Sequence, residues 1–400
     1  MPKTTKAPQS HLFQEVATTS DGRDITRGYA VFPGLMTPQD SVLQDRGGDY
    51  AVYEEILRDD QVASTFQQRR LAVTSSEWEV IPGAEDAESL KAADYLRESL
   101  ERIGWDNVTD KMLYGVFYGF SVAECLWGRE NDLIVLNAVK VRKQRRFAFA
   151  TSTSVGNPEP AGGLRLLTLD NSQGEALPEQ KFWHFRTGAD NDDEPYGLGL
   201  AHWLYWPVFF KRNGMKLWLV FMDKFGMPTA RGTYPTHATE DEKRRLLEAL
   251  RAIQTDSGII VPEGMRVELI EAARSGSVSY EVFLDRMNAA IAKVVLSQTL
   301  TTDAAGGQYK SDVHQAVRNE VVKADSDLVC ASFNNSVVRW LTTWNFPKAL
   351  PPKVRRRVTQ EPDLRPRAER DRILYDMGFK PSLDYVRKTY GEAWESRVES

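Results

Sequence analysis

One stretch of the chain, residues 196–228, constrains the fold more than any other. It opens on a glycine-rich turn, closes on Gly226-Met227-Pro228 and is the most aromatic run of the sequence. A helix is predicted, because the segment is long, lacks the alternation of a strand and ends at helix-breaking residues. Apolar side chains fall on nearly every face of this helix, so protein is expected to cover most of its sides.

What covers this helix decides what kind of protein the chain forms. A membrane span is disfavoured, because Lys211, Arg212 and Lys216 lie in the middle of the run and each charge would cost about 2.5–3.5 kcal/mol in lipid. The core of a monomer remains an alternative. We favour packing against copies of the same helix in an oligomer. The side chains expected to pack in this way, from this helix and from a later one, are Trp206, Phe210, Trp218, Phe221, Phe225, Phe283 and Met287.

The composition indicates a globular chain made in the cytosol. Its 400 residues are 42% hydrophobic, which is enough for two or three compact units. Cys125 and Cys330 lie in apolar surroundings and are predicted to be buried side chains in a reducing compartment. Residues 1–19 show no apolar signal segment. The net charge of -5 argues against a protein that binds nucleic acid over its whole surface.

The part before the aromatic run predicts mixed helices and strands. Residues 1–48, rich in Pro, Gly, Ser and Thr, are expected to form an arm. Residues 131–187 predict several short strands, with their basic side chains in solvent. A pairing of Glu124 with Arg69 or Arg70 would be more typical of a domain margin than of an active site.

The part after the run predicts a small module and two further helices. Residues 239–242 form a capping box that opens a helix, and strands at 258–261 and 266–270 predict a hairpin beside it. An amphipathic helix begins near Ser277, and a flexible segment rich in Thr and Gly separates it from a long helix that begins at Asp312. The tail from residue 347 predicts a solvated basic linker and two short helices.

No motif predicts a catalytic residue, a cofactor or a metal site. The chain lacks the phosphate-binding loop, the HExxH and GxSxG motifs and the Cys/His spacing of metal sites. The acidic loop 190–194 could meet a divalent ion through Asp190, Asp192 and Asp193, but Pro195 stands where a calcium loop needs glycine. A hydrated acidic loop is the expected state.

Two separated motifs resemble the signature of portal proteins of Mu-like bacteriophages. The first is the succession Tyr196-Gly197-x-Gly199-Leu200, Trp206-Pro207-x-x-x-Lys211 and Trp218-x-x-Phe221-x-x-x-Phe225-Gly226-x-Pro228. The second is Gly119-Phe120-Ser121-x-x-Glu124-x-x-Trp127. The resemblance implies an α+β, mainly helical portal fold whose subunits form a ring, typically of twelve. It also implies the following division: an N-terminal arm (1–48), a wing (49–195), a first stem helix (196–227), a clip (228–276), a second stem helix (277–296), a tunnel loop (297–311), a long wing helix (312–346), and a linker with crown helices (347–400).

The resemblance further implies a function without catalysis. A portal ring forms the channel at one capsid vertex through which double-stranded DNA is packaged and ejected, with weak contacts to the DNA. Its implied partners are the terminase, the major capsid protein and the head-tail adaptor proteins, and no membrane; it is assembled in the host cytoplasm and located in the virion. The expected channel-facing groups are Lys211, Arg212 and Lys216 on the stem and Thr299, Thr301, Thr302, Asp303, Gln308, Tyr309 and Lys310 on the loop. The alternatives are an oligomeric adaptor or scaffold that is not a portal, and a metal-dependent enzyme.

Overall fold

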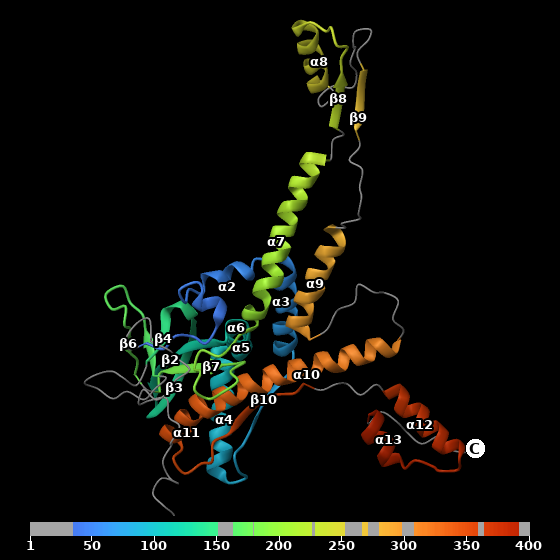
Figure 1. The fold of residues 1–400 in the computed structure, drawn as a ribbon. Helices are drawn as coiled ribbons and strands as arrows, with labels where there is room; N and C mark the ends of the chain where they lie inside the picture. The colour runs from blue at the N-terminus through green and yellow to red at the C-terminus, as the bar shows by residue number, and fades with distance from the viewer. Residues whose placement is uncertain are drawn as a thin grey trace, which may run out of the picture. The chain divides into compact units, whose positions relative to one another are not determined.

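The computed structural model describes residues 35–150, 163–178, 180–225, 229–252, 266–270, 280–297, 308–358 and 364–391. Two compact units divide the chain, one ending at Arg356 and one beginning at Arg357. The fold is α+β and mainly helical (Figure 1). No helix in these ranges is long and apolar enough to cross a membrane.

A three-stranded antiparallel sheet of order β3-β2-β7 forms the centre of the first unit. Six helices precede it along the described part of the chain, and a second small antiparallel sheet is inserted between β3 and β7. The strand patterns of residues 131–187 predict such short strands. The helices are α1 (Ser41–Gln44), α2 (Ala51–Ile56), α3 (Asp60–Thr74), α4 (Ala87–Ile103), α5 (Trp105–Met112) and α6 (Tyr114–Tyr118). The central strands are β2 (Phe120–Glu130), β3 (Leu133–Arg142) and β7 (Phe182–Arg186), and the second sheet holds β4 (Phe147–Phe149), β5 (Leu164–Leu166) and β6 (Glu175–Ala176).

A buried aromatic cluster joins the sheet to the helices on either side of it in sequence. Trp105 of α5 stacks on Trp183 of β7 at a centroid distance of 5.9 Å, and its ring lies 4.5 Å from that of Phe333. All three side chains are almost fully buried. The indole of Trp183 also donates to Ser332 Oγ at 2.6 Å. Aromatic packing of this kind therefore fixes the long C-terminal helix of the unit to the sheet.

That long helix has three segments. It comprises α10 (Gln308–Phe333), a π-helical turn η3 (Asn334–Val338) and α11 (Arg339–Asn345). The Asn334 amide donates to and accepts from the backbone of Val354, at 2.9 Å in each direction, and Asn345 pairs with Ile134 in the same way at 2.8 Å. Each asparagine side chain thus joins the long helix to the backbone of a strand residue. The helix begins four residues before the predicted start at Asp312.

The predicted basic linker is wrong, because the cluster forms a strand. β10 (Lys353–Arg356) pairs antiparallel with β1 (Trp78–Ile81), with Arg356 opposite Trp78. The Arg356 side chain is buried and binds Asp106 Oδ1 at 2.7 Å. Lys353 and Arg355 point outward while Val354 and Arg356 point inward. In this strand the buried positions are Val354 and Arg356. Because Arg356 is charged, the sequence does not show the alternation of apolar and polar residues that is typical of a strand.

The predicted arm is also shorter than expected. Residues 35–48 fold against the unit, with Leu43 1% exposed. Asp40 is buried, caps α1 and accepts hydrogen bonds from Tyr53 Oη and from the backbone of Val42. It also lies 2.8 Å from Nδ1 of His202. Residues 1–34 lie outside the described ranges.

Two long helices, α7 (Leu200–Phe225) and α9 (Tyr280–Leu296), lie side by side (Figure 1). The helix predicted from the aromatic run is therefore present, with Pro207 inside it. The start of the second helix near Ser277 falls outside the described residues.

Between these helices the chain forms a small module of α8 (Glu240–Ala252), β8 (Thr229–Thr233) and β9 (Arg266–Ile270). The predicted capping box is confirmed, since Thr239 N donates to Glu242 Oε2 at 2.8 Å and Glu242 N to Thr239 Oγ1 at 3.4 Å. β9 pairs with β8. Its predicted partner at 258–261 lies outside the described part of the chain.

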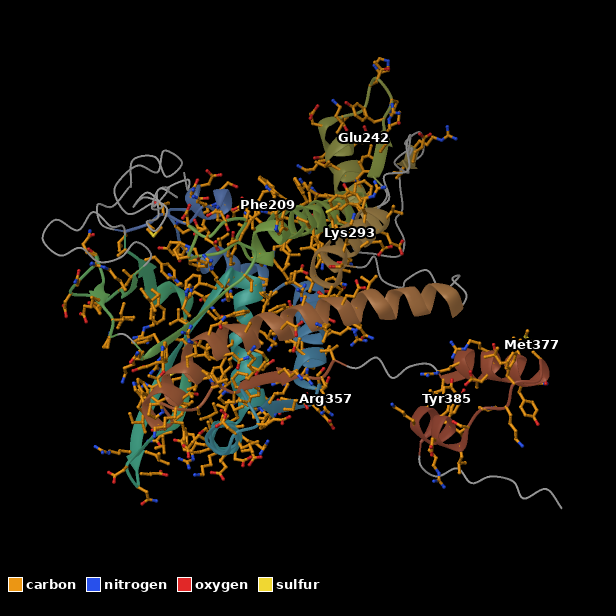
Figure 2. All side chains as sticks on the ribbon, turned by 90° about the horizontal axis from the view of Figure 1, so that it is seen from below. Phe209, Glu242, Lys293, Arg357, Met377 and Tyr385 are labelled. Carbon is orange, nitrogen blue, oxygen red and sulfur yellow. The ribbon has the colours of Figure 1, made fainter. Side chains whose placement is uncertain are left out.

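The second unit holds α12 (Leu364–Asp376) and α13 (Leu383–Tyr390), the two predicted short helices. Asp371 accepts hydrogen bonds from Tyr385 and Tyr390, each at 2.8 Å, and these bonds hold the helices together. An apolar cavity of about 480 Å³ lies between the helices. Several large apolar side chains of this unit are exposed, such as Met377, labelled in Figure 2, and Phe379.

Candidate functional site

The α7–α9 hairpin is the candidate site, because it carries the aromatic run. One stripe of α7, with three- and four-residue spacing, is buried: Ala201, Leu204, Val208 and Lys211. Further along, the Trp218 ring stacks on Tyr280 with 6.1 Å between centroids and 5° between planes. A Cβ on Gly214 would lie 2.4 Å from the Phe283 ring, so only glycine allows this approach. The helices pack antiparallel, since residue numbers on α9 rise as those on α7 fall.

The opposite side of α7 is apolar and exposed. Its aromatic rings contact one another, with 5.7 Å between the centroids of Trp206 and Phe210. The ring of Phe209, labelled in Figure 2, lies 5.9 Å from that of Trp206 and 5.8 Å from that of Phe210. The Trp206 side chain is 54% exposed and that of Phe210 48%. We call this surface the outer apolar face; its members are Trp203, Trp206, Phe209, Phe210, Leu217 and Val220. Met215, Leu219 and Met222 are also exposed, but they continue the line of the buried stripe toward the end of the helix. A continuous apolar surface of this kind marks an interaction site.

Five of the seven side chains predicted to pack between copies therefore divide into two groups. Trp206 and Phe210 belong to the outer apolar face, whereas Trp218, Phe221 and Phe283 pack between α7 and α9 of the same chain. Met287 is half-buried on α9. The side chain of Phe225 is not among those described.

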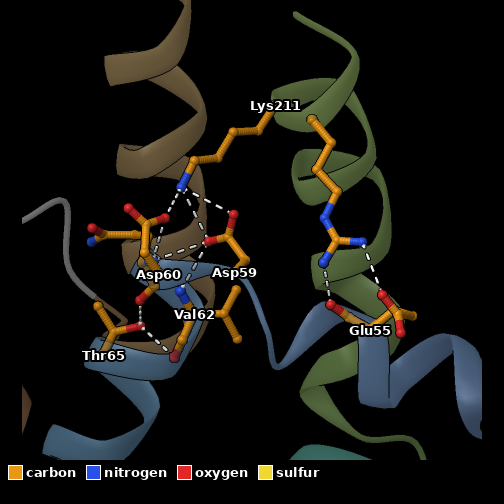
Figure 3. Close-up of polar contacts among 8 residues, drawn as sticks. Glu55, Asp59, Asp60, Val62, Thr65 and Lys211 are labelled. Atoms are coloured by element: carbon orange, nitrogen blue, oxygen red, sulfur yellow. Dashed lines mark hydrogen bonds and ion pairs between the residues drawn. The ribbon is translucent and has the colours of Figure 1, made fainter. Parts of the chain in front are cut away.

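Lys211 does not offer a free cation to a channel. Its ammonium is buried and lies 3.0 Å from Asp59 Oδ2 and 2.5 Å from Asp60 Oδ1 (Figure 3). Asp59 also caps α3 by accepting from the backbone of Gln61 and Val62. The hydrogen bond from Lys211 is the main reason that the pKa of Asp60 is lowered. The lysine thus fixes the first half of α7 to the beginning of α3.

The other two predicted stem cations differ from each other. Arg212 donates to the backbone carbonyl of Glu55 and lies 3.6 Å from its carboxylate, so it too holds α7 against the α2–α3 turn (Figure 3). Lys216 is exposed and makes no ion pair with the residues that the structure describes. Of the three, Lys216 alone presents its charge fully to the outside.

A second ion pair lies where α9 ends and the predicted loop begins. Arg69 of α3 binds Asp325 of α10 and the carbonyl of Val295, which lies on α9. Neither Arg69 nor Arg70 pairs with Glu124, whose partner is Arg142 at 2.7 Å. The pairing considered from the sequence is therefore wrong, and Glu124 serves to join β2 to β3.

Four of the seven predicted loop candidates lie outside the described residues, and three lie at the start of α10. Thr299, Thr301, Thr302 and Asp303 lie outside the described residues. Gln308, Tyr309 and Lys310 form the first turn of α10, and only their backbone is described.

Arg186 forms an ion pair and hydrogen bonds with the acidic loop. Arg186 binds the carboxylate of Asp192 at 3.0 Å and also donates to the Asp192 and Glu194 carbonyls. Across the described ranges, no group of three or more His, Cys, Asp or Glu side chains is placed to hold a metal ion. The loop therefore gives no support to the metal-dependent alternative.

Comparisons with known proteins agree with these features. The sequence profile of the family described as "Portal protein of Mu bacteriophage" matches residues 50–392. The portal protein of Escherichia phage Mu is 30% identical over 295 residues, which cover 72% of this chain and 55% of that protein. The Mu-like prophage FluMu protein gp29 of Haemophilus influenzae is 28% identical over 336 residues, or 81% of this chain and 62% of that protein. The chain thus spans little more than half the length of these relatives.

Solved structures share the fold at low identity. A chain from the neck of an empty gene transfer agent particle, in C6 symmetry, has a TM-score of 0.58 at 14% identity and covers 90% of this chain and 95% of its own. A chain from the neck of the native particle, in C12 symmetry, has a TM-score of 0.56 at 12% identity. The match covers 89% of the present chain and 94% of the neck chain. At such identities the likeness concerns the fold alone.

Proposed function

The chain belongs to the family of Mu bacteriophage portal proteins, and from this membership we propose that its copies form a ring of twelve around a central channel. The observation that carries the proposal is the outer apolar face of α7, about half of which a single chain leaves in water. Neighbouring copies would cover it, and burial of apolar surface is the main driving force for such association. The C12 symmetry of a structural neighbour's particle supports the number.

In this ring each part of the chain takes a portal role. The hairpin of α7 and α9 would be the stem, and residues 228–276 the clip. Residues 49–195 would form the wing, together with the long helix and β10. The loop at 297–311 would be the tunnel loop, and the unit that begins at Arg357 the crown.

The proposed work of the channel is to let double-stranded DNA pass during packaging and ejection. Strong contacts to phosphate release counterions and hold DNA tightly, so a channel lined with them would stall it. Two of the three stem cations are already bound to carboxylate or carbonyl groups of their own chain, which suits weak contact. The small polar side chains of the loop, Thr299, Thr301, Thr302 and Gln308, with Lys310, are the groups that we propose to face the DNA.

The portal family has a structural rather than an enzymatic role. We therefore propose that a separate motor, the terminase, supplies the energy for packaging. It would dock on the ring at the capsid vertex and later be replaced by the head-tail adaptor proteins, while the major capsid protein surrounds the wing. Assembly would take place in the host cytoplasm, and the mature location would be the virion.

Light scattering coupled to size-exclusion chromatography tests the proposal. Twelve copies of a 45.3 kDa chain should elute as one particle of roughly half a megadalton. Negative-stain images of that peak should show a central hole. A particle of about one chain mass would overturn the proposal, and a large particle without a hole would favour the adaptor or scaffold alternative.

A further inference from the structure

The two outward sides of the stem hairpin carry charges of opposite sign that have no partner in their own chain. Lys216 of α7, and Glu281 and Asp285 of α9, are all exposed. Within the described residues none of the three makes an ion pair. Arg212, nearer the base of the stem, is by contrast paired with Glu55.

These groups lie on opposite sides of the hairpin. Lys216 is two residues from both Gly214 and Trp218, which contact α9, so at about 100° per residue it points away from α9. Phe283 contacts α7 and is two residues from both Glu281 and Asp285, so the two carboxylates point away from α7. Arg286 lies a further 100° around α9 and outside this acidic stripe.

The groups also lie at the same level along the stem. Trp218 meets Tyr280 and Gly214 meets Phe283, so residue 216 lies level with residues 281 and 282. Asp285 follows about one helical turn, or roughly 5–6 Å, further along. Rotation about a ring axis leaves height unchanged, so in a stem aligned with the axis only groups at equal level can meet between copies.

We propose that Lys216 of one copy forms an ion pair with Glu281 and Asp285 of the next copy around the ring. The inference rests on the proposed ring, and its partner is a second copy of this chain. A ring needs a heterologous interface, in which two different surfaces of one subunit meet, and the two outward sides of the hairpin are such surfaces. Lys216 fits one of them and the carboxylates fit the other.

The surroundings favour a pair between copies over contact with DNA. Leu217 and Leu219 beside Lys216 are 61% and 62% exposed, and Val282 beside Glu281 is 65% exposed. When two hairpins meet, these side chains would exclude water around the charges, which strengthens their attraction and fixes the register of the helices. A lysine that reached for phosphate would leave this apolar surface uncovered.

Charge reversal tests the pair on the full chain. Lys216→Glu, and the double variant Glu281→Lys with Asp285→Lys, should each raise the protein concentration at which half of the chains are in rings, by tenfold or more at low salt. The combined triple variant should recover at least part of the loss, because it restores opposite charges in reversed positions. Sedimentation velocity measures the ring fraction, and circular dichroism verifies that each variant is folded.

Lys293→Glu is the matched control, because it makes the same change of charge on the exposed surface of the same hairpin. It should leave the ring fraction unchanged. A loss equal to that of Lys216→Glu would overturn the inference, as would a triple variant no better than its parents. If Lys216→Glu forms normal rings but changes how strongly they retain DNA, the lysine faces the channel, and the inference is overturned as well. If the unaltered chain forms no ring, it is the proposed function that fails.

Discussion

Arg69 of α3 forms a two-pronged ion pair with Asp325 of α10, with 2.6 Å from Nε to Oδ2 and 2.8 Å from Nη2 to Oδ1. The remaining guanidinium nitrogen, Nη1, donates to the Val295 carbonyl at 2.6 Å. One side chain therefore connects three helices. Two of these, α9 and α10, precede and follow the proposed tunnel loop along the chain, so Arg69 joins the two helices between which that loop runs.

Replacing Arg69 should destabilise the first unit strongly. Arg69→Ala leaves the Asp325 carboxylate, 6% exposed, without its partner, and breaking a buried pair in this way costs about 3–5 kcal/mol. Arg69→Lys should also lose much of this stability, because an ammonium group cannot bind both carboxylate oxygens of Asp325 as the planar guanidinium does. Urea unfolding measures the change. The control is Arg97→Ala, whose pair with Asp94 is exposed and should contribute less than about 1 kcal/mol; equal losses would contradict the prediction.

Lys211→Met should also destabilise the chain, although Met fits an apolar stripe. The substitution leaves Asp59, 5% exposed, as a buried unpaired charge, at a cost of about 3–5 kcal/mol. Adding Asp59→Asn should recover part of this loss, since Asn keeps the cap of α3 without the charge. A double-mutant cycle in urea measures the coupling. Additive effects of the two substitutions would refute the pairing.

His184 should make the protein sensitive to acid. Burial lowers its pKa from 6.5 to about 4. The unfolded chain then takes up a proton near pH 6.5 while the folded chain does not, so stability is full above pH 6.5 and falls until about pH 4. The loss should be on the order of 3 kcal/mol. Thermal unfolding measured between pH 4 and pH 7 gives the dependence of stability on pH. His184→Gln should reduce this dependence, whereas His237→Gln, at an exposed site, should leave it as it is. A slope unchanged in His184→Gln would contradict the assignment.

The elements that the sequence predicted well are those set by local spacing. The aromatic helix between a glycine turn and Gly226-Met227-Pro228, and the capping box of Thr239 and Glu242, depend on residues a few positions apart. The predicted length of the second stem helix stays untested at its start. Local patterns also predicted that apolar side chains would cover α7 on nearly every side, as the structure shows for its buried and outer surfaces.

What the sequence did not predict depends on residues far apart in the chain. Lys211 meets Asp59 across 152 positions and Arg69 meets Asp325 across 256. Neither partner carries a local signal, because a lysine in an apolar stripe and an arginine in a helix are as consistent with exposure as with burial. The inward Arg356 of β10 misled the pattern for the same reason, since its partner Asp106 lies 250 positions away. All three side chains are therefore positioned by contacts between residues far apart in the sequence, which a local pattern does not reveal.

Substitutions on the outer apolar face should break the ring without unfolding the chain. Trp206→Ser and Phe210→Ser remove side chains that are about half exposed in one copy, so the fold of that copy loses little. Between copies the exposed half of each aromatic side chain would be buried, and its loss should weaken every subunit interface by about 0.8–1.5 kcal/mol, half the value for a whole side chain. Light scattering should therefore show smaller particles at the same concentration, with a thermal midpoint for unfolding close to that of the unaltered chain. Leu169→Ser, at a fully exposed apolar side chain away from the stem, is the control and should leave the ring intact. If Trp206→Ser lowers the unfolding midpoint while the rings persist, the tryptophan supports the fold of a single copy and another surface must join the subunits.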